Sequence, residues 1–194
     1  GNVWLTYSMN KEDIWISRFQ APLSGTVSDH AEDRFDQLTD ADPIPRWNLY
    51  SPRWASISIV ERPTDGQPDR KALRLRHRDP ADWCRATRLF PESRTVRIRF
   101  ELECRQNHFG LLHVDLKDKR GLTVFRLILD RERTIQCKHG NGHAPIGLYG
   151  WGVLQVEMLA DCAAKEVAVQ VTYPDGVSVQ QGGMRFFGNA ETLE

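Results

Sequence analysis

The sequence lacks a surplus of charge of either sign. Lysine and arginine total 26 residues, aspartate and glutamate also total 26, and the formal net charge is therefore zero. Proteins that bind nucleic acids or membrane surfaces usually carry a basic excess or a basic run. The balanced composition therefore predicts no nucleic-acid partner and no attachment to a membrane surface.

Long apolar runs are also missing. No stretch approaches the ~18 consecutive apolar residues that span a bilayer, so we expect no membrane span. The chain begins at Gly1 rather than at methionine, and no signal peptide precedes it. We interpret this as a processed or engineered start, which would leave any export signal out of view.

The chain has few cysteines, and none lies in a CxxC pair. Cys84, Cys104, Cys137 and Cys162 are the only ones. This spacing argues against a zinc ribbon or a thioredoxin-like motif. Because Cys104 and Cys137 fall on the apolar positions of strand-like runs, we expect buried free thiols. One or two disulfides are the alternative if the protein is exported.

Helical periodicity is nearly absent, and strict alternation of apolar and polar residues dominates instead. Val96–Cys104 places Val, Ile, Phe, Leu and Cys on one face and Arg, Arg, Glu and Glu on the other. Successive strand side chains point to opposite faces, so this run predicts a half-buried strand. Similar runs are Val3–Met9, Ile14–Phe19, Ala55–Val60, Lys71–His77, Trp83–Phe90, Leu111–Lys117, Leu122–Leu129, Thr134–Lys138, Gly152–Ala160, Val167–Tyr173 and Val177–Phe187.

Turns punctuate these runs at intervals of ~8–12 residues, as in sandwiches and barrels. Short helices are predicted only at Ala31–Leu38 and Asp161–Ala164, and His139–His143 is predicted to be a loop. The absence of a strand–helix–strand rhythm excludes doubly wound folds. The sequence therefore predicts an all-β, antiparallel β-sandwich of jelly-roll type over residues 24–194, preceded by a β-hairpin and linker over residues 1–23.

Two blocks of sequence resemble a known family. Asn2–Arg18, with its stretch Tyr-Ser-Met-Asn-Lys-Glu-Asp-Ile-Trp, resembles the closing strands of bacterial sialidase-like β-propeller proteins with BNR repeats. Trp47–Trp54, Leu73–Trp83 and Ala86–Pro91 resemble the domain that follows such propellers. That domain is similar to concanavalin A-like or laminin-G-like jelly rolls.

The resemblance implies a large secreted or periplasmic glycosidase-like protein, of which this chain holds the last propeller hairpin and the following domain. The missing propeller would then be a partner within the same polypeptide. No Asp-box (Ser-x-Asp-x-Gly-x-x-Trp) occurs here, so no sialidase catalytic residue is carried over. We therefore expect a noncatalytic accessory domain that binds carbohydrate or braces the catalytic module.

The alternating strands point to one polar sheet surface as the candidate binding site. Arginine and carboxylate side chains bond sugar hydroxyls, and arginine can grip the carboxylate of an acidic glycan bidentately. Exposed tryptophans can add stacking platforms, whereas we expect Trp151 in the core. The alternative is a solvated or propeller-facing surface laced with ion pairs. The candidate residues are Arg97, Arg99, Glu101, His113, Asp115, Arg126, Trp54 and Trp83.

Paired carboxylates raise a catalytic alternative, a jelly-roll glycoside hydrolase or polysaccharide lyase. Glu101 and Glu103 lie on one strand face, and Asp115 and Glu157 could join them from neighbouring strands. Glycoside hydrolysis usually needs two such groups. The Glu-x-Asp-x-x-Glu motif of jelly-roll glucanases is absent, however, and arginines share the same strand phase. A third alternative is a purely structural interaction domain.

No cofactor is predicted, and metal sites have weak support. His139 and His143 have the spacing of a helical metal site, but the glycines between them oppose a helix. An acidic cluster before Pro43 could hold a structural calcium ion, which takes carboxylate oxygens; the alternative is a helix N-terminus with stabilising acids. The cluster comprises Asp29, Glu32, Asp33, Asp36, Asp40 and Asp42.

Overall fold

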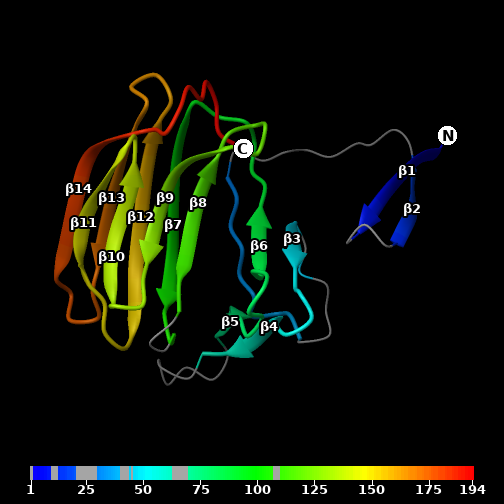
Figure 1. Cartoon of the computed structure of the whole chain (residues 1–194), viewed down its shortest axis with the longest axis horizontal. Coiled ribbons are helices and arrows are strands. Elements are labelled where there is room, and N and C mark those ends of the chain that lie inside the picture. The colour runs from blue at the N-terminus through cyan, green and yellow to red at the C-terminus, as the bar shows by residue number, and fades with distance from the viewer. Residues whose placement is uncertain are drawn as a thin grey trace. The chain divides into compact units, whose positions relative to one another are not determined.

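The computed structural model describes residues 2–9, 13–20, 30–39, 44, 46–62, 70–106 and 110–194. These residues form strands, bridges and turns, and none of them is helical (Figure 1). No helix within these ranges is therefore long and apolar enough to cross a membrane. The backbone divides into two units, Gly1–His30 and Ala31–Glu194. The predicted division between residues 23 and 24 falls outside the described ranges.

The first unit contains a two-stranded antiparallel sheet. Strand β1 (Asn2–Met9) pairs with β2 (Asp13–Gln20), and Asn2 faces Gln20 at one end of the pair. Both predicted N-terminal strands are therefore present. The predicted turn that joins them lies outside the described residues.

The second unit is built on two four-stranded antiparallel sheets, which we name the β7 sheet and the β8 sheet (Figure 1). The β7 sheet has the order β14-β13-β12-β7, and the β8 sheet has the order β11-β10-β9-β8. The all-β antiparallel sandwich expected from the sequence is thus confirmed. The strands are β7 (Thr95–Glu103), β8 (Leu112–Lys117), β9 (Thr123–Leu129), β10 (Thr134–His139), β11 (Gly142–Leu148), β12 (Val153–Asp161), β13 (Glu166–Thr172) and β14 (Ser178–Arg185).

Two small antiparallel pairs precede these sheets. They are β3 (Trp47–Tyr50) with β6 (Arg85–Arg88), and β4 (Ser56–Glu61) with β5 (Lys71–Arg76). The segment that leads into β6 lies against β8, because the Trp83 and His113 rings are 6.4 Å apart and nearly parallel.

Alternation along the strands creates the core between the two sheets. Every second residue of β12 and β13 is apolar and buried, and β9 buries Phe125, Leu127 and Leu129 together with Val124 and Ile128 of its other face. Each such side chain contributes about 1.5–3 kcal/mol on leaving water. The largest fully buried side chains are Phe125, Leu127, Leu129, Ile135, Met158, Met184, Leu193, Val167, Val169, Val171 and Cys137.

All four cysteines are free thiols, as the sequence analysis favoured. Cys137 and Cys162 are buried, and Cys84 and Cys104 are half-buried. Desolvation raises the pKa of the Cys137 thiol to about 12. The thiolate is the reactive form of cysteine, so Cys137 is an inert core residue.

Both predicted helices are wrong. Ala31–Leu38 is irregular, with a turn at Asp36, because the carboxylate of Asp36 accepts a hydrogen bond from the distant Lys71 backbone N–H at 2.9 Å. A helix this short is marginal, and such tertiary contacts override it. Asp161–Ala164 is the end of β12 and a turn, in which the Asp161 carboxylate accepts from the Ala163 and Ala164 backbone N–H groups.

The strand β11 was not among the predicted strands, which left residues 144–151 unassigned. β11 is an edge strand, and its register with β10 shifts between Ile135 and Gln136, opposite Pro145. Edge strands and bulges tolerate the missing proline N–H. The predicted loop His139–His143 is therefore a tight turn inside a β-hairpin.

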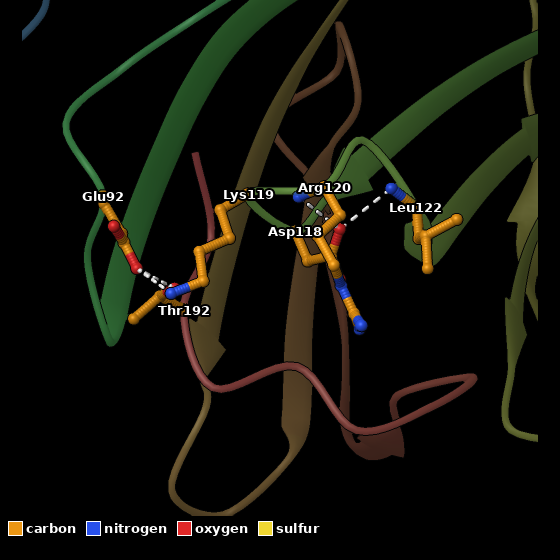
Figure 2. A network of polar contacts seen from close by, with 6 residues as sticks. All are labelled: Glu92, Asp118, Lys119, Arg120, Leu122 and Thr192. Atoms are coloured by element: carbon orange, nitrogen blue, oxygen red, sulfur yellow. Dashed lines mark hydrogen bonds and ion pairs between the residues drawn. The ribbon is translucent and has the colours of Figure 1, made fainter.

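The last described segment is anchored to the sandwich. Leu193 is fully buried and forms bridges with Ser93 and Asp118. Figure 2 shows the polar contacts beside it: the Asp118 carboxylate accepts from the Arg120 and Leu122 backbone N–H groups, both at 2.9 Å. Glu92 accepts from the Thr192 hydroxyl at 2.5 Å and the Lys119 ammonium at 3.1 Å (Figure 2). These contacts close one end of the core.

Candidate functional site

The predicted single polar surface is wrong, because the structure divides its residues between the two sheets. Arg97, Arg99 and Glu101 lie on the outward side of β7, whereas His113 and Asp115 lie on β8. These two strands follow each other in the chain but belong to opposite sheets. Alternation separates inward from outward residues, but it does not say which sheet a strand joins.

The outward side of the β7 sheet is a network of ion pairs. Glu157 contacts both Arg99, at 2.6 Å, and Arg97, at 3.5 Å. Glu101 accepts a hydrogen bond from Arg62 at 2.5 Å. The hydrogen bond from Arg99 lowers the pKa of Glu157. A shallow hollow of about 400 Å³ lies over this network, lined by Arg99, Phe100, Glu101, Gln155, Val156, Glu157, Gln170 and Thr172.

The outward side of the β8 sheet carries a denser polar arrangement. Asp115, Arg126, Lys138 and His143 are successive cross-strand partners on β8, β9, β10 and β11. Arg126 binds the Asp115 carboxylate through two hydrogen bonds, from Nε at 2.6 Å and from Nη2 at 2.8 Å. Both side chains are largely shielded from solvent, which strengthens the pair.

An aromatic group borders this row, and we name Trp83, His77 and His113 the Trp83 platform. The Trp83 ring lies 5.3 Å from the His77 ring and 6.4 Å from the His113 ring, with interplanar angles of 5° and 15°. Trp83 nevertheless stays 52% exposed. A half-exposed aromatic side chain beside paired polar groups can take the apolar C–H face of a sugar ring and bond its hydroxyls.

Asp82 holds the platform in place. Its carboxylate accepts hydrogen bonds from the Tyr50 hydroxyl and, at 2.7 Å, from the Trp83 backbone N–H. Its backbone carbonyl bonds His77 Nε2. The Tyr50 hydrogen bond lowers the pKa of Asp82 and raises that of Tyr50. The Arg85 guanidinium lies 4.6 Å from the centre of the Tyr50 ring. Tyr50 on β3 and Arg85 on β6 therefore hold the turn that contains Trp83 in place.

The charge state of His113 follows from its surroundings. Desolvation is the main cause that lowers the pKa of His113. The positive charges of Arg126 and Lys138 lower this pKa further, whereas the negative charge of Asp115 raises it. The imidazole is therefore neutral at pH 7, with one donor and one acceptor nitrogen. The hydrogen bond to Asp115 raises the pKa of Arg126. A neutral hydroxyl-rich ligand suits this mixture of groups.

The other predicted tryptophans lie elsewhere. Trp54 is 56% exposed and faces the Arg53 guanidinium at 5.6 Å, not the platform rings. Trp151, which we expected in the core, is 68% exposed. The roles of His77 and Asp82 were not predicted, although both residues lie within the block Leu73–Trp83 that carried the family resemblance.

The candidate catalytic carboxylates are all paired with arginine. Glu101 pairs with Arg62, Glu103 with Arg105 and Asp115 with Arg126. The pKa of Glu157 is lowered by Arg99, the opposite of what a general acid needs. The arrangement matches the ion-pair alternative and offers no acid and base pair among these four groups.

The acidic cluster is only partly described, since Asp29, Asp40 and Asp42 lie outside the described ranges. Glu32 pairs with Arg34, while Asp33 accepts hydrogen bonds from Trp47 and Arg88. Within the described ranges, no group of three or more His, Cys, Asp or Glu residues converges as a metal site.

Comparisons with known proteins identify the family and the fold of the chain. The family model "Sialidase-like, CBM domain" matches residues 47–192. A solved structure described as a sialidase is similar over 100% of this chain, with a TM-score of 0.77 and 33% sequence identity. The match spans only 17% of that sialidase chain. No curated protein shows a significant match to the sequence.

Proposed function

The chain belongs to the sialidase-like CBM-domain family, a family of carbohydrate-binding modules, and from this premise we propose that its Trp83 platform binds the saccharide. In this proposal the domain is a noncatalytic accessory to a sialidase-like glycoside hydrolase. One observation carries the choice of site: half-exposed Trp83 lies parallel to His77 and His113 beside the Asp115–Arg126 pair.

The platform supplies the two kinds of contact that a saccharide needs. The Trp83 ring offers an apolar surface, and its position is fixed before binding by Asp82, which limits the entropy lost on binding. Asp115 and Arg126 are hydrogen-bonded to each other, but this uses only some of their hydrogen-bonding positions. The guanidinium keeps further donors, and the carboxylate keeps further acceptors, for sugar hydroxyls. His113 adds a neutral donor and acceptor.

The accessory role is supported by what this chain contains. It corresponds to 17% of the length of the similar sialidase, and its candidate carboxylates are paired with arginines. The β1–β2 sheet would belong with a propeller in the same polypeptide, and the protein would act outside the cytoplasm, in a secreted or periplasmic setting. A calcium ion at the acidic cluster would have a structural role and would take no part in sugar binding.

A glycan-array screen of the whole chain, with and without calcium, tests this function. We expect selective binding that Trp83→Ala abolishes and Trp54→Ala leaves unchanged, with both variants as folded as the wild type by thermal unfolding. Binding lost only in Trp54→Ala would move the site away from the platform. A folded wild type that binds no glycan would contradict the lectin-like function and favour interdomain bracing.

A further inference from the structure

Three connections meet at the end of the sandwich where β9, β11 and β13 finish. They are the turns after Leu129, after Leu148 and after Thr172. The Tyr149 backbone N–H donates to the Arg133 carbonyl at 2.8 Å, which joins the first two. A Cβ on Gly152 would lie 2.8 Å from Pro174 Cγ, so the second and third are packed together. The three loops therefore form one continuous, packed surface.

Trp151 projects from this surface into solvent. Its exposed fraction is 68%, larger than those of Trp54 and Trp83. Its neighbour Gly152 has a φ of 108°, a conformation open mainly to glycine, and its close approach to Pro174 also requires glycine. The chain thus uses a special backbone position to turn a large apolar side chain outward, which packing alone would not favour.

Arg133 is held in an unfavourable backbone conformation directly beside Trp151. Its φ is 62°, where glycine or asparagine is usual and other residues cost about 1–2 kcal/mol. The turn itself needs no arginine, because the Asp130 carboxylate satisfies it by accepting from the Glu132 and Thr134 backbone N–H groups. Strain of this kind often marks a functional residue.

The guanidinium of Arg133 faces Trp151 rather than a carboxylate. Its central carbon lies 5.2 Å from the centre of the Trp151 ring. Within the described chain Arg133 forms no ion pair, so its donors are available to a ligand. Arg131, in the same turn, is 64% exposed at its side chain and 4.0 Å from Glu132, a weak pair that leaves the Arg133 guanidinium without a carboxylate partner among the described residues.

We propose that Trp151 and Arg133 form a second carbohydrate site that takes an acidic saccharide. The sugar ring packs on the open part of the Trp151 ring, and the Arg133 guanidinium binds the sugar carboxylate through parallel hydrogen bonds. This inference rests on the proposed carbohydrate-binding function but not on the Trp83 platform. Two sites on one domain would raise the affinity for a chain or surface of repeated sugars through effective concentration.

Calorimetric titration of the whole chain tests the site, with sialyllactose and digalacturonic acid as acidic probes and lactose as the neutral control. The main variant is Arg133→Asn, since asparagine tolerates the left-handed backbone and should keep or raise stability. We expect it to weaken binding of at least one acidic probe about tenfold or more, from the loss of a charged hydrogen bond. Trp151→Ala should abolish that binding, and Trp83→Ala should retain it.

The outcomes separate the two proposals. Unchanged binding of both acidic probes in Arg133→Asn and Trp151→Ala, together with loss in Trp83→Ala, would overturn the second site and leave the platform. Loss in the first two variants with full binding in Trp83→Ala would support the second site alone. A folded wild type that binds neither acidic probe would overturn the second site, and the glycan array would decide the platform separately.

Discussion

Arg126 donates two hydrogen bonds to Asp115 across neighbouring strands, from Nε to Oδ1 at 2.6 Å and from Nη2 to Oδ2 at 2.8 Å. This fork spans β8 and β9 on the surface that Trp83 borders. The two residues are therefore both a structural pair and a candidate binding pair, and their two roles can be separated by substitution.

Arg126→Lys keeps the positive charge but removes the planar fork. We expect saccharide affinity to fall about tenfold, because lysine cannot bond a carboxylate and a hydroxyl in the same fixed geometry. The free energy of unfolding should fall by about 1 kcal/mol, because lysine keeps the positive charge of this shielded pair but loses the second hydrogen bond. Calorimetry and chemical denaturation measure the two effects, and Arg99→Lys on the other sheet is the matched control. Equal losses of affinity in both variants would contradict the assignment.

His113 should give the protein a measurable pH dependence. Its pKa in the folded state lies below the ordinary 6.5, so folding favours the neutral form. The stability from this residue is therefore complete above pH 6.5 and is lost as the pH falls through the folded-state pKa. In His113→Gln the drop in unfolding free energy between pH 7.5 and pH 5 should be smaller. An NMR titration that gives His113 a pKa above 6.5 would refute this.

Gly152→Ala and Gly150→Ala form a matched pair in one loop. Alanine at 152 meets Pro174 and must hold a φ of 108°, whereas a Cβ at 150 meets nothing within 4 Å. We expect Gly152→Ala to lower the unfolding free energy by about 1–3 kcal/mol and Gly150→Ala to change it by less than about 0.5 kcal/mol. Urea denaturation of both variants checks this. Equal effects would mean that the Trp151 loop is not held as described.

Leu193→Ala tests whether the last segment is part of the core. Leu193 is 0% exposed and pairs with Ser93 and Asp118. Its truncation should cost about 2–5 kcal/mol, from lost burial and the cavity left behind. Val177→Ala, at a 57% exposed residue, is the control and should be close to neutral. A thermal shift no larger than that of the control would show that the segment only covers the surface.

Much of the sandwich was predictable, because one face of a strand such as Val96–Cys104 must be apolar to reach the core. The division of Arg99 and His113 between two sheets was not, since it depends on how the chain crosses between layers. β11 was not predicted, and it contains Pro145, which a strand accepts mainly at the edge of a sheet, where β11 lies.

Most residues of the candidate site could be predicted from the sequence, but their position next to one another could not. His113, Asp115 and Arg126 follow from the alternation on β8 and β9, and Trp83 from its polar surroundings. Their meeting depends on Asp82 and Tyr50, which are distant in sequence and join through a hydrogen bond. Trp151 was assigned to the core because tryptophan is highly buried on average, and because the family that the sequence resembles has a core tryptophan at this place. The backbone at Gly152 reverses that expectation.

The most direct test of the central claim is an NMR titration of the whole chain with the strongest glycan-array ligand, following the tryptophan indole and histidine ring signals. We expect saturable shifts of the Trp83 indole and of the His77 and His113 rings, with a common dissociation constant. Saturable binding that leaves these three signals unmoved, and instead shifts residues such as Arg97 and Arg99 on the β7 sheet, would contradict the claim.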